Sequence, residues 1–133
     1  MRIREEYRGS KKVVCSLVLE NDESPAIEFL EQLKLSNPQS HKKMVERYKR
    51  HAEIGPSRNT KHERHIVSSG NLWEFKTPQG DRLLYFNHSH NRVILSDGFH
   101  SGHKSHDQQQ YDNAAQIRDA FLKEEEERGS ATK

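Results

Sequence analysis

The chain has 133 residues, of which 31% are hydrophobic and 32% are charged. This length accommodates one domain with a small core and excludes two separate cores. The sequence contains no apolar run long enough to span a membrane and predicts no signal peptide, and its single cysteine, Cys15, excludes a disulfide framework, so we expect a cytoplasmic protein.

The net charge of +2 is distributed unevenly along the chain. Residues 41–104 contain 12 Lys or Arg against 6 Asp or Glu, whereas residues 105–133 contain 4 against 7. Clustered cations attract phosphate groups without regard to sequence, so the middle of the chain favours binding to a polyanion. The acidic end either shields a basic groove or is a solvated tail without a function.

The first half of the chain predicts a strand and two helices. Residues 1–12 are highly charged and are expected to form a flexible N-terminus. Residues 13–19 are apolar and β-branched, which predicts a buried strand. Two helices follow, the first capped by Ser24 and the second by Ser40, and Gly55 ends the second helix.

The second half predicts three strands and a last helix. Residues 58–70 are polar without a clear period and are expected to form a loop. Three strands follow, joined by connections so short that they require antiparallel hairpins; they cover residues 72–77, 82–88 and 92–97. A loop rich in Gly and His then leads to a helix over residues 109–126.

The predicted order is therefore β-α-α-β-β-β-α. It indicates a single α+β domain over residues 13–122, in which two N-terminal helices and a C-terminal helix pack on a small twisted, mainly antiparallel sheet. Residues 123–133 are expected to form an acidic, disordered tail.

Ionisable residues gather near the ends of the three predicted strands. Alternation puts Glu74 and Lys76 on the open face of the sheet, and Arg82 begins the next strand. Each of these alone is explained as a solvated surface residue. Together with His100 and Lys104 they suit cleavage of a phosphodiester, because Arg holds a phosphate bidentately and imidazole titrates near working pH.

The sequence indicates the roles of several other residues less directly. Tyr85 falls on the face opposite Arg82 and is expected in the core. Tyr111 either forms hydrogen bonds or stacks on a base. The candidates for RNA binding outside the catalytic set are Lys61, Arg64, His103 and Tyr111.

The histidines invite a metal-binding interpretation. His100, His103 and His106 are spaced three apart, and His88 and His90 form a His-x-His pair. No Cys accompanies them and the nearby carboxylates lack a diagnostic spacing, so no metal ligands are assigned. A His-rich metal-binding protein is one alternative function.

Several segments together resemble phage-derived toxins of the RelE/HigB type, within the RelE/ParE superfamily. Residues 24–33 (SPAIEFLEQL) are similar to the family's first-helix signature, and residues 51–56 (HAEIGP) fit its break after the paired helices. The segments LWEFK, DRLLYF and VILSDGF match its three strands in order, and Ala114 and Ala115 fall where its last helix carries Ala. The similarity covers roughly residues 13–121 and is carried by the ordered set.

The resemblance implies a RelE-like fold and the toxin of a type II toxin–antitoxin pair. Such toxins cut mRNA in the ribosomal decoding site without a metal or other cofactor, because the RNA 2′-hydroxyl attacks the adjacent phosphate. The implied partners are an antitoxin protein, the ribosome and mRNA, with no membrane involved.

The same resemblance implies roles for individual residues. Lys76 and Arg82 would hold the phosphate, His100 would act as the general acid, and Glu74 or Lys104 would take the side of the base. Two cations that the family carries after its Gly-Phe pair are replaced here by a His and a Ser, and no Thr-Pro precedes the last helix. A non-catalytic RNA- or protein-binding relic of the same fold is therefore a second hypothesis.

Overall fold

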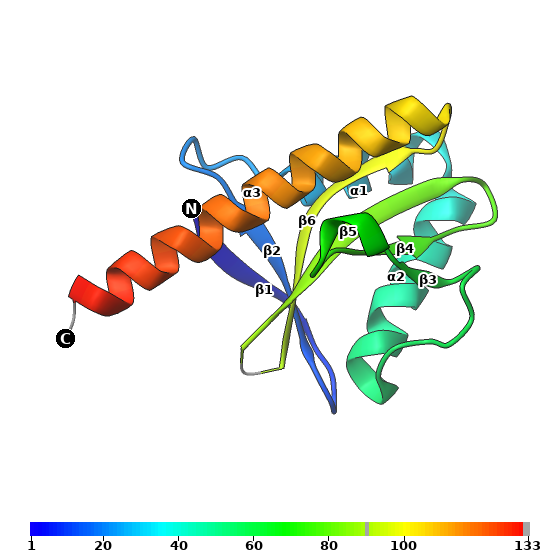
Figure 1. Cartoon of the computed structure of the whole chain (residues 1–133). Coiled ribbons are helices and arrows are strands. Elements are labelled where there is room, and N and C mark those ends of the chain that lie inside the picture. Colours follow the sequence, from blue (N-terminus) through cyan, green and yellow to red (C-terminus); the bar gives the residue numbers. More distant parts are fainter. Residues whose placement is uncertain (90, 132–133) are drawn as a thin grey trace.

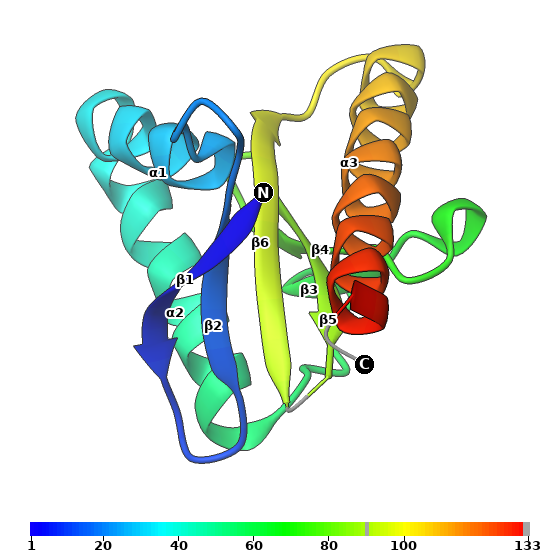
Figure 2. The ribbon, with the colours of Figure 1, turned by 90° about the vertical axis from the view of Figure 1, so that its left-hand side faces the viewer.

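The computed structural model describes residues 1–89 and 91–131 and consists of one six-stranded sheet between three α-helices. Helices α1 and α2 cover one face of the sheet, and α3 crosses the other face (Figures 1 and 2). In chain order the elements are β1 (Arg2–Arg8), β2 (Val13–Val18), α1 (Pro25–Ser36), α2 (Pro38–Ile54), β3 (Glu63–His65), the 3₁₀ turn η1 (Val67–Ser69), β4 (Trp73–Lys76), β5 (Asp81–His88), β6 (Arg92–His100) and α3 (Lys104–Ala131).

The sheet has the strand order β1-β2-β6-β5-β4-β3. Strands β2 and β6 are parallel, and the other neighbouring strands are antiparallel. The parallel pair is possible because α1 and α2 lie in the long connection that follows β2. The α+β class predicted from the sequence is confirmed, with a mixed sheet.

The core is divided by the sheet into two layers. Towards α1 and α2, buried aromatic and aliphatic side chains from both helices and four strands pack together, including Leu30, Met44, Phe75, Tyr85 and Leu95. Tyr85 is 1% exposed, as its position on the strand predicted. Beneath α3, two smaller clusters contain Leu72, Leu84, Phe99, Tyr111 and Phe86, Ile94, Phe121.

Helix α2 begins two residues earlier than its predicted cap. The side chain of Asn37 accepts a hydrogen bond from the backbone N–H of Ser40 at 3.2 Å, and Pro38 occupies the first turn. Ser40 is therefore inside the helix, where its side chain is buried against the sheet. Gly55 ends the helix with a φ of 93°, which favours glycine at this position.

Residues 2–8, which the sequence placed in a flexible N-terminus, form the edge strand β1. Its backbone pairs with β2, and its charged side chains form ion pairs with one another: Arg4 Nε lies 2.8 Å from Glu6, and Arg8 Nη2 lies 2.6 Å from Glu5. An edge strand that is half exposed lacks the apolar alternation by which buried strands are recognised.

Two further segments differ from the sequence prediction. Part of the expected loop over residues 58–70 forms β3, whose three residues pair with β4, and then η1. Strand β6 continues past the expected end at residue 97 to His100, because β5 supplies backbone partners as far as Asp81. The charged composition of residues 63–65 conceals β3, and Gly98 with the following His-rich residues conceals the extension of β6.

Helix α3 replaces the expected acidic tail. It starts at Lys104, earlier than predicted, and continues to residue 131, while residues 132–133 lie outside the described residues. Its second half is held to the sheet by polar contacts: Glu124 lies 3.1 Å from the Met1 amine, and Glu125 lies 2.6 Å from His88 Nε2. Within the described part of the chain, no helix is both long enough and apolar enough to cross a membrane.

Candidate functional site

A hollow of about 580 Å³ lies between the β3–η1 segment, the β4–β5 hairpin and the first turns of α3. We call it the basic groove, because Arg64, Lys76, Arg82 and Lys104 all line it. Tyr111 also lines it. Five residues that were singled out from the sequence are thus brought together, and they come from four different elements.

Strand register explains this convergence. Lys76 of β4 stands directly opposite Arg82 of β5, and Arg64 of β3 stands opposite Glu74 of β4. Directly paired residues in antiparallel strands share a face, so these side chains all lie on the face that α3 covers. Helix α3 then contributes Lys104 and Tyr111, which are seven residues and thus about two turns apart on one side.

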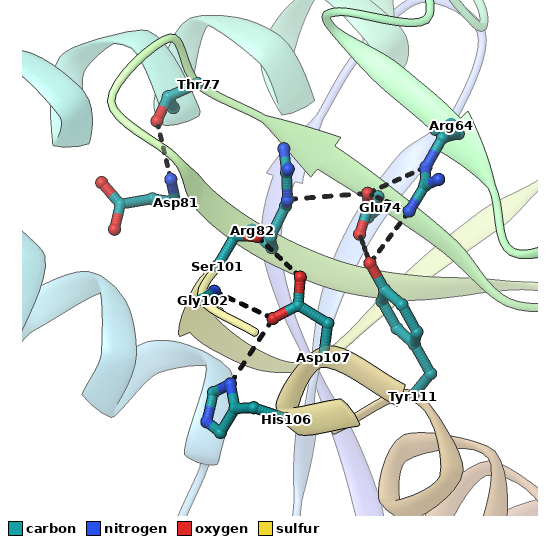
Figure 3. A network of polar contacts seen from close by, with 10 residues as sticks. All are labelled: Arg64, Glu74, Thr77, Asp81, Arg82, Ser101, Gly102, His106, Asp107 and Tyr111. Atoms are coloured by element: carbon teal, nitrogen blue, oxygen red, sulfur yellow. Dashed lines mark hydrogen bonds and ion pairs between the residues drawn. The ribbon is translucent and has the colours of Figure 1, made fainter. Parts of the chain in front are cut away.

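Glu74 is not on an open face, as alternation alone suggested, but is fully buried beneath the groove. Figure 3 shows three side chains converging on it. The Tyr111 hydroxyl donates to its Oε2 at 2.7 Å, Arg64 Nη2 lies 3.0 Å from its Oε1, and Arg82 Nε lies 3.7 Å from the same oxygen. The open face predicted for Glu74 is wrong because α3 covers this side of the sheet.

The same network determines the state of Tyr111. Burial and the hydrogen bond to Glu74 raise the pKa of Tyr111 to about 12, so its hydroxyl stays protonated at neutral pH. Arg64 also donates to the Tyr111 hydroxyl at 3.0 Å. Of the two readings kept open for Tyr111, hydrogen bonding is the one that the structure displays.

Arg82 is only partly neutralised by Glu74. Its side chain is 17% exposed, and in the described part of the chain its buried Nε makes no hydrogen bond, although Glu74 lies at ion-pair distance. Because Glu74 is shared with Arg64, one carboxylate faces two guanidinium groups. The groove therefore keeps positive charge available for an anion.

Lys76 lies beside Arg82 and lines the groove. Burial lowers the pKa of Lys76, and the positive charge of Arg82 lowers it further. In the part of the chain that the structure describes, its amine has no hydrogen-bond partner, while its backbone carbonyl accepts from Arg47 Nε at 3.1 Å. A lysine in this setting exchanges a proton more readily than a solvated one.

Asp107, which the sequence did not single out, holds the segment before α3 against the groove. It accepts hydrogen bonds from Ser101 Oγ at 2.6 Å and Gly102 N–H at 3.0 Å, and His106 Nδ1 lies 3.4 Å away (Figure 3). Burial opposes the charge, but these bonds outweigh it and lower the pKa of Asp107. An acidic residue in the first turn of a helix was the signal for this role.

His100 lies apart from the basic groove. Its strand partner is Asp81, whose neighbour Arg82 points to the α3 side, so alternation directs His100 towards α1 and α2. His100 Nδ1 lies 3.0 Å from Asp81, which also accepts from Ser40 Oγ. The His100 side chain is 67% exposed.

The remaining candidate residues for RNA binding, Lys61 and His103, do not line the basic groove. Lys61 is exposed and lines a second, smaller hollow next to the groove, and His103 is exposed just before α3. His90 lies outside the described residues. Within the described ranges, no group of three or more His, Cys, Asp or Glu side chains is arranged to hold a metal ion.

Comparison with known proteins adds no assignment: no protein-family model and no curated protein matches this chain.

Proposed function

We propose that this chain is a RelE-like, metal-independent endoribonuclease that cuts mRNA on the ribosome in the cytoplasm, as the toxin of a type II toxin–antitoxin pair. The observation that carries the proposal is the convergence of Arg64, Lys76, Arg82 and Lys104 on one groove above a buried carboxylate. The ordered sequence resemblance over roughly residues 13–121 supports it.

The positions of the groove residues suggest a role for each of them in RNA cleavage. Arg82 and Arg64 hold the phosphate and stabilise the charge that develops when the RNA 2′-hydroxyl attacks it. Lys104 adds positive charge at the start of α3, where the helix dipole has the same sign. Glu74 positions the two arginines, because its oxygens are already bound by Tyr111 and Arg64.

Among the groove residues, Lys76 is the one best suited to transfer a proton. The pKa of Lys76 is lowered by burial and by the charge of Arg82, and Lys76 lines the groove. His100, the residue that the resemblance assigned to the acid, is oriented by Asp81 near the β4–β5 turn and reaches only RNA that passes over this turn. Glu74 is buried too deeply to act as the base.

The decisive test is primer extension on a translated message, with purified ribosomes and either wild-type protein or Arg82→Ala. We expect new 5′ ends with the wild type and their loss with Arg82→Ala, because the variant lacks the guanidinium that faces the phosphate. Lys34→Ala, which removes an exposed cation from α1 on the other side of the sheet, is the matched control and should cleave normally. Equal cleavage by wild type and Arg82→Ala would refute the assigned site.

A non-catalytic RNA-binding relic of the same fold is the second candidate. It is favoured by the engagement of Glu74 in ion pairs and by the position of His100 outside the groove. In the same experiment it predicts salt-sensitive binding of RNA that depends on Arg82 but produces no new 5′ ends. The metal-binding alternative gains no support from the described residues.

The expected protein partner is an antitoxin that covers the basic groove. A segment suited to this groove would carry carboxylates, since four cations line it. Its binding should therefore weaken with salt and should compete with RNA.

A further inference from the structure

A second hollow of about 350 Å³ lies beside the β4–β5 turn. It shares Lys76 and Arg82 with the basic groove, so the two hollows adjoin along these side chains. The rest of its lining is Arg47, Lys61, His62, Thr77, Pro78 and Gly80.

Backbone contacts fix the shape of this second hollow. The N–H of Lys76 donates to the carbonyl of His62 at 2.8 Å, which extends the pairing of β3 with β4 by one step. On the other side, Arg47 of α2 donates to the carbonyl of Lys76 at 3.1 Å. The cations around it are therefore held by α2, β4 and the segment before β3 rather than by a free loop.

Among the residues that the structure describes, the lining is positively charged and includes no carboxylate. Burial lowers the pKa of His62, and the charges of Arg47 and Arg50 lower it further, which reports the positive potential at this point. Lys61 is exposed and, among the described residues, its amine has no ion-pair partner. An anion that enters this hollow meets several cations, of which, within the described ranges, only Arg82 forms an ion pair with a carboxylate, that of Glu74 beneath the basic groove.

We propose that the second hollow binds a second phosphate of the RNA strand, adjacent to the phosphate held in the basic groove. The strand then runs from η1 across Lys76 and Arg82 to Lys61, over the β4–β5 turn. This inference rests on the proposed function, because it extends the same RNA path. It also brings the strand towards Gly80, against which the ring of His100 lies.

The test uses 2′-O-methyl oligonucleotides, which bind but lack the 2′-hydroxyl needed for cleavage. A two-nucleotide probe carries one internal phosphate, and a six-nucleotide probe reaches both hollows. With Lys61→Ala we expect up to about fivefold weaker binding of the longer probe and unchanged binding of the shorter one. The plot of log K against log salt for the longer probe should become shallower by about 0.7, the value for one phosphate contact on a single strand.

Two further variants help to distinguish failure of the second phosphate site from failure of the proposed function. Lys11→Ala removes an exposed cation from the hairpin between β1 and β2 and should leave both probes unaffected, while Lys61→Arg should restore the salt slope. If Lys61→Ala behaves like Lys11→Ala with the longer probe, the second phosphate site is refuted, whatever the effect of Arg82→Ala on the two probes. If Arg82→Ala weakens neither probe, the proposed function itself fails.

Discussion

Glu74 is a buried carboxylate shared by side chains of three elements: Arg64 of β3, Arg82 of β5 and Tyr111 of α3. A carboxylate without exposure is stable only if such partners compensate for its lost hydration. Its removal would leave two guanidinium groups and a phenol without their acceptor. Glu74 therefore couples the stability of the fold to the geometry of the basic groove.

This coupling predicts a graded series of stability losses. Glu74→Ala should lower the free energy of unfolding by about 3 kcal/mol, because it leaves buried charge unpaired. Tyr111→Phe should cost about 1 kcal/mol, the value of one hydrogen bond. Arg64→Ala should cost less than about 1 kcal/mol, since 46% of the Arg64 side chain is exposed. Urea unfolding measures all three.

Glu31→Ala, at an exposed position on α1, is the control for loss of a carboxylate and should change the unfolding free energy little. A loss for Glu74→Ala no larger than that for Arg64→Ala would mean that the network does not stabilise the fold.

The residues of the groove could be predicted because strand alternation and short hairpins determine which side chains share a face. Alternation puts Glu74 and Lys76 on one face, whereas the position of Arg82 beside Lys76 follows only from the register of β4 with β5. The position of His100 could not be predicted, since the sequence gives no sign that β6 continues beyond residue 97. The extra strand residues place His100 opposite Asp81, on the other face from Arg82.

Strand β3 is the element that positions Arg64, and it is held by a second buried carboxylate. Glu63 accepts hydrogen bonds from Tyr85 at 2.9 Å and from the N–H of Ser57 at 2.6 Å, and its Oε1 also contacts His51 of α2. Because successive residues of a strand point to opposite faces, Glu63 is tied to α2 while Arg64 faces the groove. This three-residue strand is thus held by side-chain contacts as well as by its short ladder with β4.

The Glu63 contacts predict a specific pH dependence of stability. Burial opposes ionisation, but the hydrogen bond and charge of His51, with the other bonds, outweigh it and lower the pKa of Glu63 from 4.5. A carboxyl whose pKa is lower in the folded state contributes stability above its unfolded value, and this contribution disappears as pH falls through the folded value. The unfolding free energy of the wild type should therefore decrease more steeply below about pH 4.5 than that of Glu63→Gln.

Urea unfolding of both proteins at a series of pH values measures this difference. Parallel pH profiles for the wild type and Glu63→Gln would contradict the role of Glu63. Asp107→Asn is a useful comparison, since the pKa of Asp107 is also lowered but its contacts lie at the start of α3.

The elements with a regular apolar pattern were the easier ones to predict. The helices α1 and α2 and the hairpins of β4, β5 and β6 have apolar periods and turn residues that identify them. Strands β1 and β3 lie at the two edges of the sheet and are mostly polar, so their pairing depends on tertiary neighbours. The last turns of α3 were missed for the same reason, because four consecutive Glu residues suggest a solvated tail.

At the scale of the whole molecule, α3 separates the two charged regions of the chain. Its first turns line the basic groove, and its acidic residues, Glu124 to Glu127, lie near its other end, which projects beyond the sheet (Figures 1 and 2). The rise of 1.5 Å per residue puts Glu124 about 30 Å from Lys104 along the helix. While α3 is helical, the acidic segment cannot shield the groove of its own molecule.

Glu124 should instead stabilise the start of the edge strand β1, while Glu125 should hold the end of β5. Glu124 and Glu125 contact the Met1 amine and His88, whereas Glu126 and Glu127 are exposed. The double variant Glu124→Ala/Glu125→Ala should speed amide exchange in β1, lowering its opening free energy by about 1 kcal/mol, without changing RNA affinity. Glu126→Ala/Glu127→Ala removes the same charge and should affect neither quantity. Tighter RNA binding by either double variant would instead show that the acidic segment shields the groove.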